Sequence, residues 1–266
     1  MASPDKPATR ESALKSIADF ASEIRSGDQR IIAKAASLVE DFELLVSELK
    51  PFLGVPDKLP PIIGITGSPG VGKSTTTSAL INLIRKNGES VAIVAIDPSS
   101  AITGGALLGD RIRLTHHFSD KKVFIRSLAT RGALGGLSNA TDSVVYILSI
   151  AGFDNVIIET VGVGQSEIEV MRHADTVMVV LAPGMGDGIQ AAKAGVMEIG
   201  DLYLINKEDR GGADEVAREV ERSLALSAKD ANWKPPVLIG SMENETGASA
   251  VLAAIHSHLN YLHTKN

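Results

Sequence analysis

The stretch Gly67-Ser68-Pro69-Gly70-Val71-Gly72-Lys73-Ser74 decides the fold, and it directly follows the apolar run at residues 62–66. It fits the P-loop pattern G-x-x-x-x-G-K-S, in which backbone N–H groups surround the phosphates of a nucleotide. Residues 75–86 continue with a helical pattern. The glycines allow a tight turn around a β-phosphate, and the positive end of the helix dipole adds to the attraction. This strand–loop–helix context predicts a nucleoside triphosphate site.

Two side chains of this loop carry specific chemistry. Lys73 offers a positive charge to the β- and γ-phosphates, and the Ser74 hydroxyl is a ligand for Mg²⁺. We therefore assign Lys73 to binding and catalysis, and Ser74 to nucleotide and metal binding. The predicted phosphate-contacting set is Gly67, Ser68, Pro69, Gly70, Val71, Gly72, Lys73, Ser74 and Thr75.

Short apolar runs and helical patterns alternate along the rest of the chain, which favours a parallel sheet covered on both faces. We predict an α/β fold over residues 61–266, a P-loop NTPase with a doubly wound, mostly parallel sheet and helices on both faces. Ligands of such sheets bind at the carboxyl ends of the strands. The predicted strands after the first are residues 91–96, 123–128, 156–159, 176–181, 202–205 and 237–239.

A helical extension precedes this domain. Apolar residues recur at helical spacing between residues 12 and 50, interrupted by Gly27 and Asp28, which predicts two amphipathic helices. Residues 51–61 contain four prolines, and we expect them to end the helices and to form a linker. Residues 1–60 are therefore the predicted extension and linker.

The pattern N-K-x-D, here Asn206-Lys207-Glu208-Asp209, indicates which base is bound. The Asp209 carboxylate can accept from N1–H and the 2-amino group of guanine, whereas adenine has an acceptor at N1 and no 2-amino group. We expect Lys207 to lie along the base and Asn206 to tie this loop to the phosphate loop. Ser241-Met242 follows the last predicted strand, and its backbone N–H groups are candidates to bind guanine O6.

Three acidic residues lie at or beyond the ends of predicted strands, namely Asp97, Asp110 and Glu159. Magnesium prefers oxygen ligands, so these carboxylates and Ser74 form a predicted magnesium site. Taken singly, Asp97 also fits a helix N-cap and Asp110 a solvated loop acid.

Glu159 also opens a glycine-rich stretch typical of a nucleotide switch. The N–H of Gly162 can respond to the γ-phosphate, and Gln165 can orient the attacking water. Glu159 and Gln165 thus join Lys73 as candidate catalytic residues, although Gln165 fits an ordinary loop residue equally well.

The composition excludes several classes of function. The 266 residues include no cysteine and carry a net charge of −6, which excludes disulfides, thiolate metal sites and cysteine nucleophiles. Without a basic run, we expect neither nucleic acid nor a membrane surface as partner. The first residues have no apolar targeting segment, so we expect a cytoplasmic protein.

Together with the phosphate loop, four further stretches resemble the MeaB/MMAA family of G-proteins. They are Asp97-Pro98-Ser99-Ser100, Thr103-Gly104-Gly105, Gly109-Asp110-Arg111 and residues 159–167. The resemblance implies a GTPase that binds GTP/GDP and Mg²⁺ through Lys73, Ser74, Asp97, Asp110 and Glu159. It also implies a cobalamin-dependent acyl-CoA mutase as partner. The family gates transfer of adenosylcobalamin from an adenosyltransferase to this mutase and helps to eject damaged cofactor.

The resemblance extends to regulatory segments. Residues 183–193 match the additional switch of the family, with Asp187, Gln190 and Lys193 as its polar members, and Arg113 is a candidate switch I partner. The simpler alternative is a solvated loop and helix start. Family members continue into an arm exchanged between subunits, whereas this chain ends at Asn266, so a homodimer would have to form without that arm.

The main alternative is a GTPase that inserts nickel into urease or hydrogenase. Such proteins use clustered soft or imidazole ligands, whereas this chain has six histidines and no cysteine. We interpret His116 and His117 as switch-loop surface and expect the C-terminal histidines to lie on an exposed helix end. A transport-energising ATPase is a third possibility, against which Asp209 argues.

Overall fold

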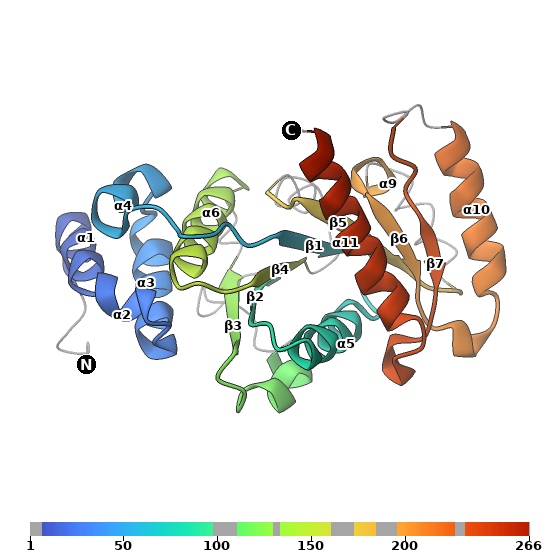
Figure 1. Ribbon diagram of the computed structural model, residues 1–266, viewed down its shortest axis with the longest axis horizontal. Helices are drawn as coiled ribbons and strands as arrows, with labels where there is room; N and C mark the ends of the chain where they lie inside the picture. The colour runs from blue at the N-terminus through green and yellow to red at the C-terminus, as the bar shows by residue number, and fades with distance from the viewer. Residues whose placement is uncertain are drawn as a thin grey trace.

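The computed structural model describes residues 7–97, 111–129, 134–160, 173–184, 196–226 and 232–265. Its centre is a seven-stranded sheet (Figure 1), and each of the seven predicted strands is confirmed with its ends shifted by at most one residue. The strands are β1 (Ile62–Thr66), β2 (Val91–Asp97), β3 (Val123–Ala129), β4 (Asn155–Thr160), β5 (Thr176–Leu181), β6 (Leu202–Ile205) and β7 (Val237–Ile239).

The strand order is β3-β2-β4-β1-β5-β6-β7, and each paired neighbour among the described strands is parallel. Strand β1 therefore lies in the middle, between β4 and β5. Ile65 pairs with Glu159 of β4, and Thr66 pairs with Val179 of β5. This register brings Glu159 beside the point where the chain leaves β1 for the phosphate loop.

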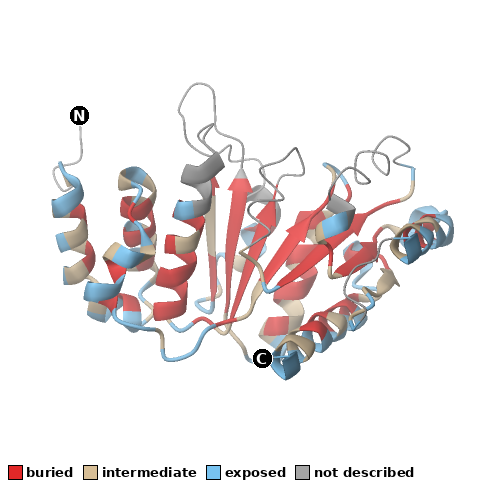
Figure 2. Ribbon diagram, turned by 90° about the horizontal axis from the view of Figure 1, so that it is seen from above, coloured by how far each residue is buried: buried red, intermediate tan, exposed pale blue. Residues whose placement is uncertain are grey.

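Helices cover both faces of the sheet because successive strand residues alternate between the two faces, and both faces are apolar. Helices α5 (Lys73–Lys86) and α11 (Ala248–Lys265) pack on one face, where Ile63 and Ile65 of β1 lie. Helices α6 (Leu134–Ile150) and α10 (Ala213–Leu226) pack on the other face. Figure 2 shows the buried strands between these layers. The predicted doubly wound α/β fold is confirmed.

The shorter described elements connect these layers. They are α9 (Val196–Ile199) and the 3-10 helices η1 (Arg111–His117), η2 (Glu208–Arg210) and η3 (Met242–Asn244). None of the helices in the described ranges combines the length and the apolar character that a bilayer crossing requires.

The helical extension differs from its prediction of two helices. Four helices form instead: α1 (Arg10–Asp19), α2 (Ala21–Arg25), α3 (Gln29–Phe42) and α4 (Val46–Leu53). A break occurs at Phe20, and a second occurs at Glu43, which takes a left-handed conformation with φ of 49°.

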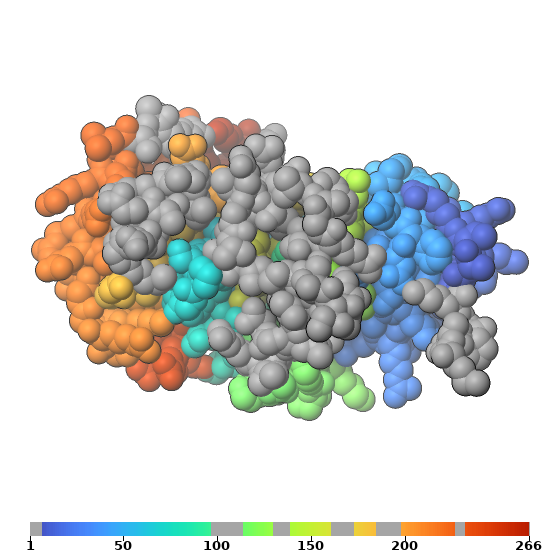
Figure 3. All heavy atoms as spheres, turned by 180° about the vertical axis from the view of Figure 1, so that it is seen from behind, coloured from blue at the N-terminus to red at the C-terminus, as the bar shows by residue number. Residues whose placement is uncertain are grey.

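The predicted linker also begins later than expected. Pro51 lies inside α4, and the helix ends only at Gly54, where φ is 70°. In the space-filling view the extension occupies one end of the molecule, and the segment containing α10 occupies the opposite end (Figure 3).

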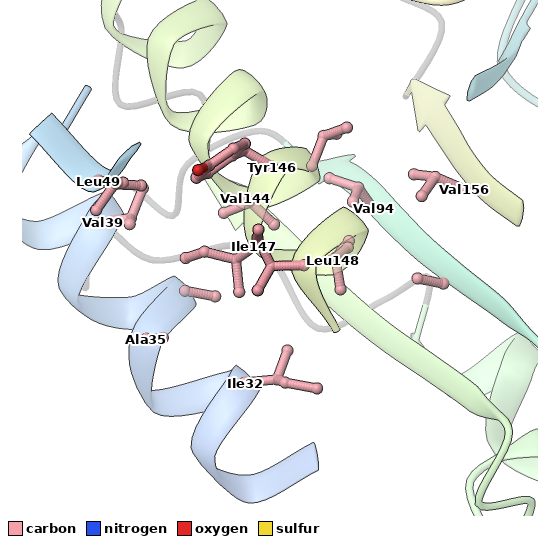
Figure 4. Packing of buried hydrophobic residues seen from close by; sticks show 14 of the residues in the cluster. Ile32, Ala35, Val39, Leu49, Val94, Val144, Tyr146, Ile147, Leu148 and Val156 are labelled. Carbon is pink, nitrogen blue, oxygen red and sulfur yellow. The ribbon is translucent and has the colours of Figure 1, made fainter. Parts of the chain in front are cut away.

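The extension packs on the sheet domain through α3, and α6 lies between α3 and the sheet (Figure 4). Ile32, Ala35 and Val39 of α3 and Ile147 of α6 are fully buried in this contact. The extension and the sheet therefore share one apolar core. Burial of this core contributes strongly to the free energy of unfolding.

Helix α3 also covers the exposed edge of β3. The Gln29 side-chain amide donates to the carbonyls of Lys121 and Val123, at 3.1 and 3.0 Å. In the middle of β3, the Arg126 guanidinium donates to Glu40 at 2.8 Å and to the Ser37 hydroxyl at 3.1 Å. These polar contacts hold α3 in position. The Gln29 contacts also provide hydrogen-bond donors for backbone carbonyls at β3, which is an edge strand of the sheet.

The expectation that the C-terminal histidines are all exposed is wrong for His258. This residue of α11 is only 4% exposed, with its Nδ1 atom 3.0 Å from the Thr176 hydroxyl and its ring centroid 4.7 Å from that of Trp233. Burial lowers the pKa of His258, although the Asp201 and Asp175 carboxylates oppose this shift. The residue is therefore part of the packing between α11 and β5.

Candidate nucleotide site

The phosphate loop joins the carboxyl end of β1 to the first turn of α5. Two of its glycines are required by their surroundings. Gly67 has a φ of 142°, and a Cβ atom there would lie 2.1 Å from the Val180 carbonyl oxygen. Gly72 has a φ of 98°, and a Cβ atom would lie 2.3 Å from Nδ2 of Asn206. The loop thus approaches its neighbours more closely than any side chain would allow.

Lys73 lies inside this loop and is 7% exposed. Its ammonium group donates to the carbonyl oxygens of Gly67 and Ser68, at 2.7 and 3.1 Å. A buried ammonium needs such partners because its desolvation is costly. Phosphate oxygens carry full negative charge and bind an ammonium more strongly than neutral carbonyls do, so these contacts can be exchanged for contacts to a nucleotide.

Glu159 is the acidic residue that the fold brings to this loop. It lies near the carboxyl end of β4, is 5% exposed, and accepts two hydrogen bonds from hydroxyl groups of α5. Ser74 donates to its Oε1 atom at 2.6 Å, and Thr77 donates to its Oε2 atom at 2.7 Å. These short, charge-assisted bonds stabilise a carboxylate that would otherwise be costly to bury.

Ser74 and Glu159 fit a magnesium site by their chemistry. Both are hard oxygen donors beside the phosphate loop, the kind of ligand that Mg²⁺ takes together with phosphates and water. Asp97 ends β2, but its side chain falls outside the description, and Asp110 lies outside the described residues. The described ranges contain no cluster of three or more His, Cys, Asp or Glu residues that could hold a metal ion. A magnesium ion at Ser74 and Glu159 would therefore need further ligands.

The loop after β6 lies against the phosphate loop. Asn206 is 2% exposed and donates through Nδ2 to the Val71 carbonyl at 2.9 Å. Lys207, which takes a left-handed conformation with φ of 64°, donates to the Gly70 carbonyl at 2.5 Å. The predicted base-binding and phosphate-binding loops therefore contact each other at the carboxyl edge of the sheet.

The backbone N–H groups of Ser241 and Met242 have partners inside the protein. The Ser241 N–H donates to the Thr246 carbonyl at 3.1 Å, and the Met242 N–H donates to Oδ1 of Asn206 at 3.0 Å. The first bond belongs to the antiparallel bridge between Ser241 and Thr246. The contact of these N–H groups with guanine O6 stays a prediction.

A different contact from Ser241 was not predicted. Its hydroxyl donates to Oδ1 of Asp209 at 2.6 Å, and this hydrogen bond is the main reason why the pKa of Asp209 lies below its usual value. The contact favours the ionised form of Asp209 and restrains its carboxylate. Sequence reasoning missed it because two loops far apart in the chain make it.

The predicted switch residues fall largely outside the description. Gly162, Gln165, Asp187, Gln190 and Lys193 lie outside the described residues. Arg113 belongs to η1, but its side chain is not described.

The end of η1 is anchored to the phosphate-loop helix. Nε2 of His117 lies 2.9 Å from the Ser78 hydroxyl of α5, and burial lowers the pKa of His117. His117 is therefore half-buried against α5, whereas His116 beside it is exposed.

Comparison with known proteins identifies the family. The family model described as "Methylmalonyl Co-A mutase-associated GTPase MeaB" matches residues 43–266. A putative GTPase of Pyrococcus horikoshii is 42% identical over 256 residues, which cover 94% of this chain and 80% of that protein. The mitochondrial methylmalonic aciduria type A homolog of Caenorhabditis briggsae is 38% identical over 200 residues, which cover 73% of this chain and 48% of that protein.

Among solved structures, the crystal structure of a LAO/AO transport system kinase superimposes with a TM-score of 0.72 at 27% identity. The match covers 98% of this chain and 79% of that one. The family match and the sheet-edge geometry agree: this chain belongs to the MeaB family and is a GTPase with a P-loop NTPase fold.

Proposed function

We propose that this chain is a magnesium-dependent GTPase that gates delivery of adenosylcobalamin to an acyl-CoA mutase of the methylmalonyl-CoA mutase type, and that it protects or reactivates this mutase. The nucleotide part rests on one observation, the meeting of the phosphate loop, Glu159 and the Asn206–Asp209 loop at one edge of the sheet. The mutase part is supported by the description of the family model and by the name of the Caenorhabditis relative.

The phosphates of GTP would lie in the loop of residues 67–75, with Lys73 exchanging its carbonyl partners for β- and γ-phosphate oxygens. Catalysis of phosphoryl transfer depends mainly on positioning and on stabilising the developing charge. Lys73 supplies positive charge for this purpose. Glu159 and, outside the described residues, Gln165 are the proposed groups that hold or orient water.

Magnesium would be held by Ser74 and Glu159, completed by Asp97 and Asp110. The bound ion would neutralise charge between the β- and γ-phosphates. Gly162 would respond to the γ-phosphate, so that hydrolysis changes the switch segments.

The guanine base would be selected by Asp209. Its carboxylate is held by the Ser241 hydroxyl and keeps a lowered pKa, so it can accept from two N–H groups of guanine. Lys207 would lie along the base. Adenine would offer this carboxylate no matching N–H donors. The lost hydrogen bonds would weaken the binding of adenine nucleotides relative to guanine nucleotides.

The mutase would contact the switch segments, for which Arg113, Asp187, Gln190 and Lys193 are the proposed residues. An adenosyltransferase would be the donor of the cofactor. The extension of α1–α4 lies to one side of the sheet, beside the strands rather than beyond their carboxyl ends (Figure 2).

The experiment measures GTP hydrolysis with and without a purified adenosylcobalamin-dependent acyl-CoA mutase. We expect the mutase to accelerate hydrolysis. The matched control is Asp209→Asn, which should prefer xanthosine triphosphate to GTP. In this variant the mutase should therefore accelerate hydrolysis of xanthosine triphosphate rather than of GTP. Acceleration that stays with GTP in the variant would come from a contaminating GTPase. If no cobalamin-dependent mutase accelerates hydrolysis by the wild-type chain, the chaperone role is refuted.

Nickel insertion is the competing function. It predicts tight Ni²⁺ binding by the chain, which equilibrium dialysis measures directly. Acceleration of hydrolysis by urease or hydrogenase precursors, with none by a mutase, would favour it.

A further inference from the structure

Thr77 lies outside the phosphate-loop pattern, but its side chain contacts Glu159, a residue of the proposed metal site. It is one helical turn beyond Ser74 on α5, so both hydroxyls lie on the same face of the helix. Thr77 is fully buried, and its hydroxyl donates to Oε2 of Glu159 at 2.7 Å, while Ser74 donates to Oε1 at 2.6 Å. One carboxylate is therefore held at both oxygens by one helix.

This arrangement fixes the rotation of the Glu159 carboxylate. A carboxylate held by a single hydrogen bond can turn about its terminal torsion, which has broad preferences. With Oε2 bound to Thr77, Oε1 stays directed at the Ser74 hydroxyl.

The Ser74 hydroxyl has one proton and two lone pairs. As long as Oε1 of Glu159 accepts the proton, the lone pairs remain for a cation. A hydroxyl whose proton has a fixed acceptor is a better metal ligand, because the surrounding hydrogen bonds orient ligands and raise their basicity.

We propose that Thr77 is a positioning residue for magnesium: its hydroxyl holds Glu159 so that Glu159 orients the Ser74 hydroxyl toward the ion. The inference rests on the proposed magnesium site. It assigns to Thr77 no contact with nucleotide or metal.

The chain offers a matched control in the neighbouring residue. Thr76 is also fully buried on α5, but its hydroxyl donates at 2.9 Å to the carbonyl of Gly72, the N-cap residue of the same helix. Thr76→Val and Thr77→Val therefore remove the same atom from the same kind of environment, and only Thr77→Val removes a partner of Glu159. Thr77→Ser keeps the hydroxyl.

The test is GDP binding by calorimetry across a range of Mg²⁺ concentrations, a measurement that does not depend on hydrolysis. We expect Thr77→Val to raise the Mg²⁺ concentration for half-maximal enhancement of binding by about tenfold, which is the usual size of one lost hydrogen bond to a charged group. We expect Thr77→Ser and Thr76→Val to remain near wild type. If Thr77→Val does not fold, the pair Thr77→Ala and Thr77→Ser gives the same comparison, with Thr77→Ala showing the loss.

The outcomes distinguish failure of the proposed magnesium site from failure of the role of Thr77. Should the wild-type chain bind GDP equally well with and without Mg²⁺, the magnesium site itself is refuted. A second outcome is that Mg²⁺ strengthens GDP binding equally in the wild type and in Thr77→Val, or in Thr77→Ala if that variant replaces it. The magnesium site would then remain, and the role of Thr77 would be overturned. An equal loss in Thr76→Val would also overturn it, because the effect would then come from the helix.

Discussion

The nucleotide edge and the contact between α3 and α6 are both buried, but they are built from opposite kinds of residue. At the nucleotide edge Lys73, Ser74, Thr77, Glu159 and Asn206 are buried polar groups that bind one another or backbone atoms. The α3–α6 contact is an apolar cluster (Figure 4). Buried polar pairs add little net stability, whereas apolar burial is the main source of it. Substitutions at the first region should therefore change binding, and those at the second should change stability.

Lys73→Ala should give the largest effect. It removes the charge directed at the transferring phosphoryl group, and loss of such a group reduces rates by about 100- to 1,000-fold. We expect GTP hydrolysis to fall by that factor and the melting temperature to change little, as activity and thermal denaturation assays would measure. Lys86→Ala, on the exposed part of the same helix, is the control and should keep wild-type activity. A large loss of melting temperature in Lys73→Ala would contradict the comparison.

Ile147→Ala should give the opposite pattern. Ile147 is fully buried between α3 and the sheet, and truncation of a buried isoleucine costs about 2–5 kcal/mol. Denaturant unfolding should show this loss, while the GDP affinity of the folded protein stays unchanged. Val55→Ala is the control, because Val55 is 71% exposed. Weakened GDP binding in a folded Ile147→Ala protein would show that the two regions are coupled.

Asp209→Asn should change the preferred base with almost no change in stability. Losing hydrogen bonds to a charged acceptor costs about 2 kcal/mol, or roughly a 30-fold loss in GTP affinity. The amide can instead donate to the 2-oxo group of xanthine, so affinity for xanthosine triphosphate should rise. Competition binding with both nucleotides measures this exchange, and an unchanged preference for GTP would exclude Asp209 as the selecting group.

The smallest effect concerns pH and lies away from the nucleotide edge. Burial lowers the pKa of His258 in the folded protein, so the unfolded chain binds more protons when the pH falls through the ordinary histidine pKa. The contribution of His258 to stability is therefore fully present above about pH 6.5 and decreases below it.

We expect the wild type to lose more stability between pH 7 and pH 5.5 than His258→Gln does, as measured by denaturant unfolding. Because the pKa of His117 is lowered as well, the variant should keep part of the pH dependence. His256→Gln, at an exposed position of the same helix, should behave as the wild type. Equal pH dependence of wild type and His258→Gln would contradict the prediction.

The sequence predicted the parts of this molecule that local patterns determine. The seven strands follow from apolar runs, and the phosphate loop follows from glycines at fixed spacing. Asn206 was expected to join the two loops, and the structure brings it to the Val71 carbonyl. These features were accessible because the residues that cause them are close in sequence or follow buried strands.

Contacts between distant segments were not accessible. The hydroxyl of Thr77 is opposite Glu159 only because β4 pairs with β1, and Ser241 reaches Asp209 only because β7 pairs with β6. His258 is buried because Trp233 and Thr176 cover it, which helical spacing alone does not reveal. The break at Glu43 depends on a left-handed residue that is not a glycine, and such a residue gives no signal in the sequence.

The most direct test of the central claim is a calorimetric titration of the wild-type chain with GDP and with ADP, each with and without Mg²⁺. The arrangement at the sheet edge predicts binding of one GDP per chain that is strengthened by Mg²⁺, and far weaker binding of ADP. No heat of binding with GDP in the presence of Mg²⁺, or equal affinities for the two nucleotides, would contradict it.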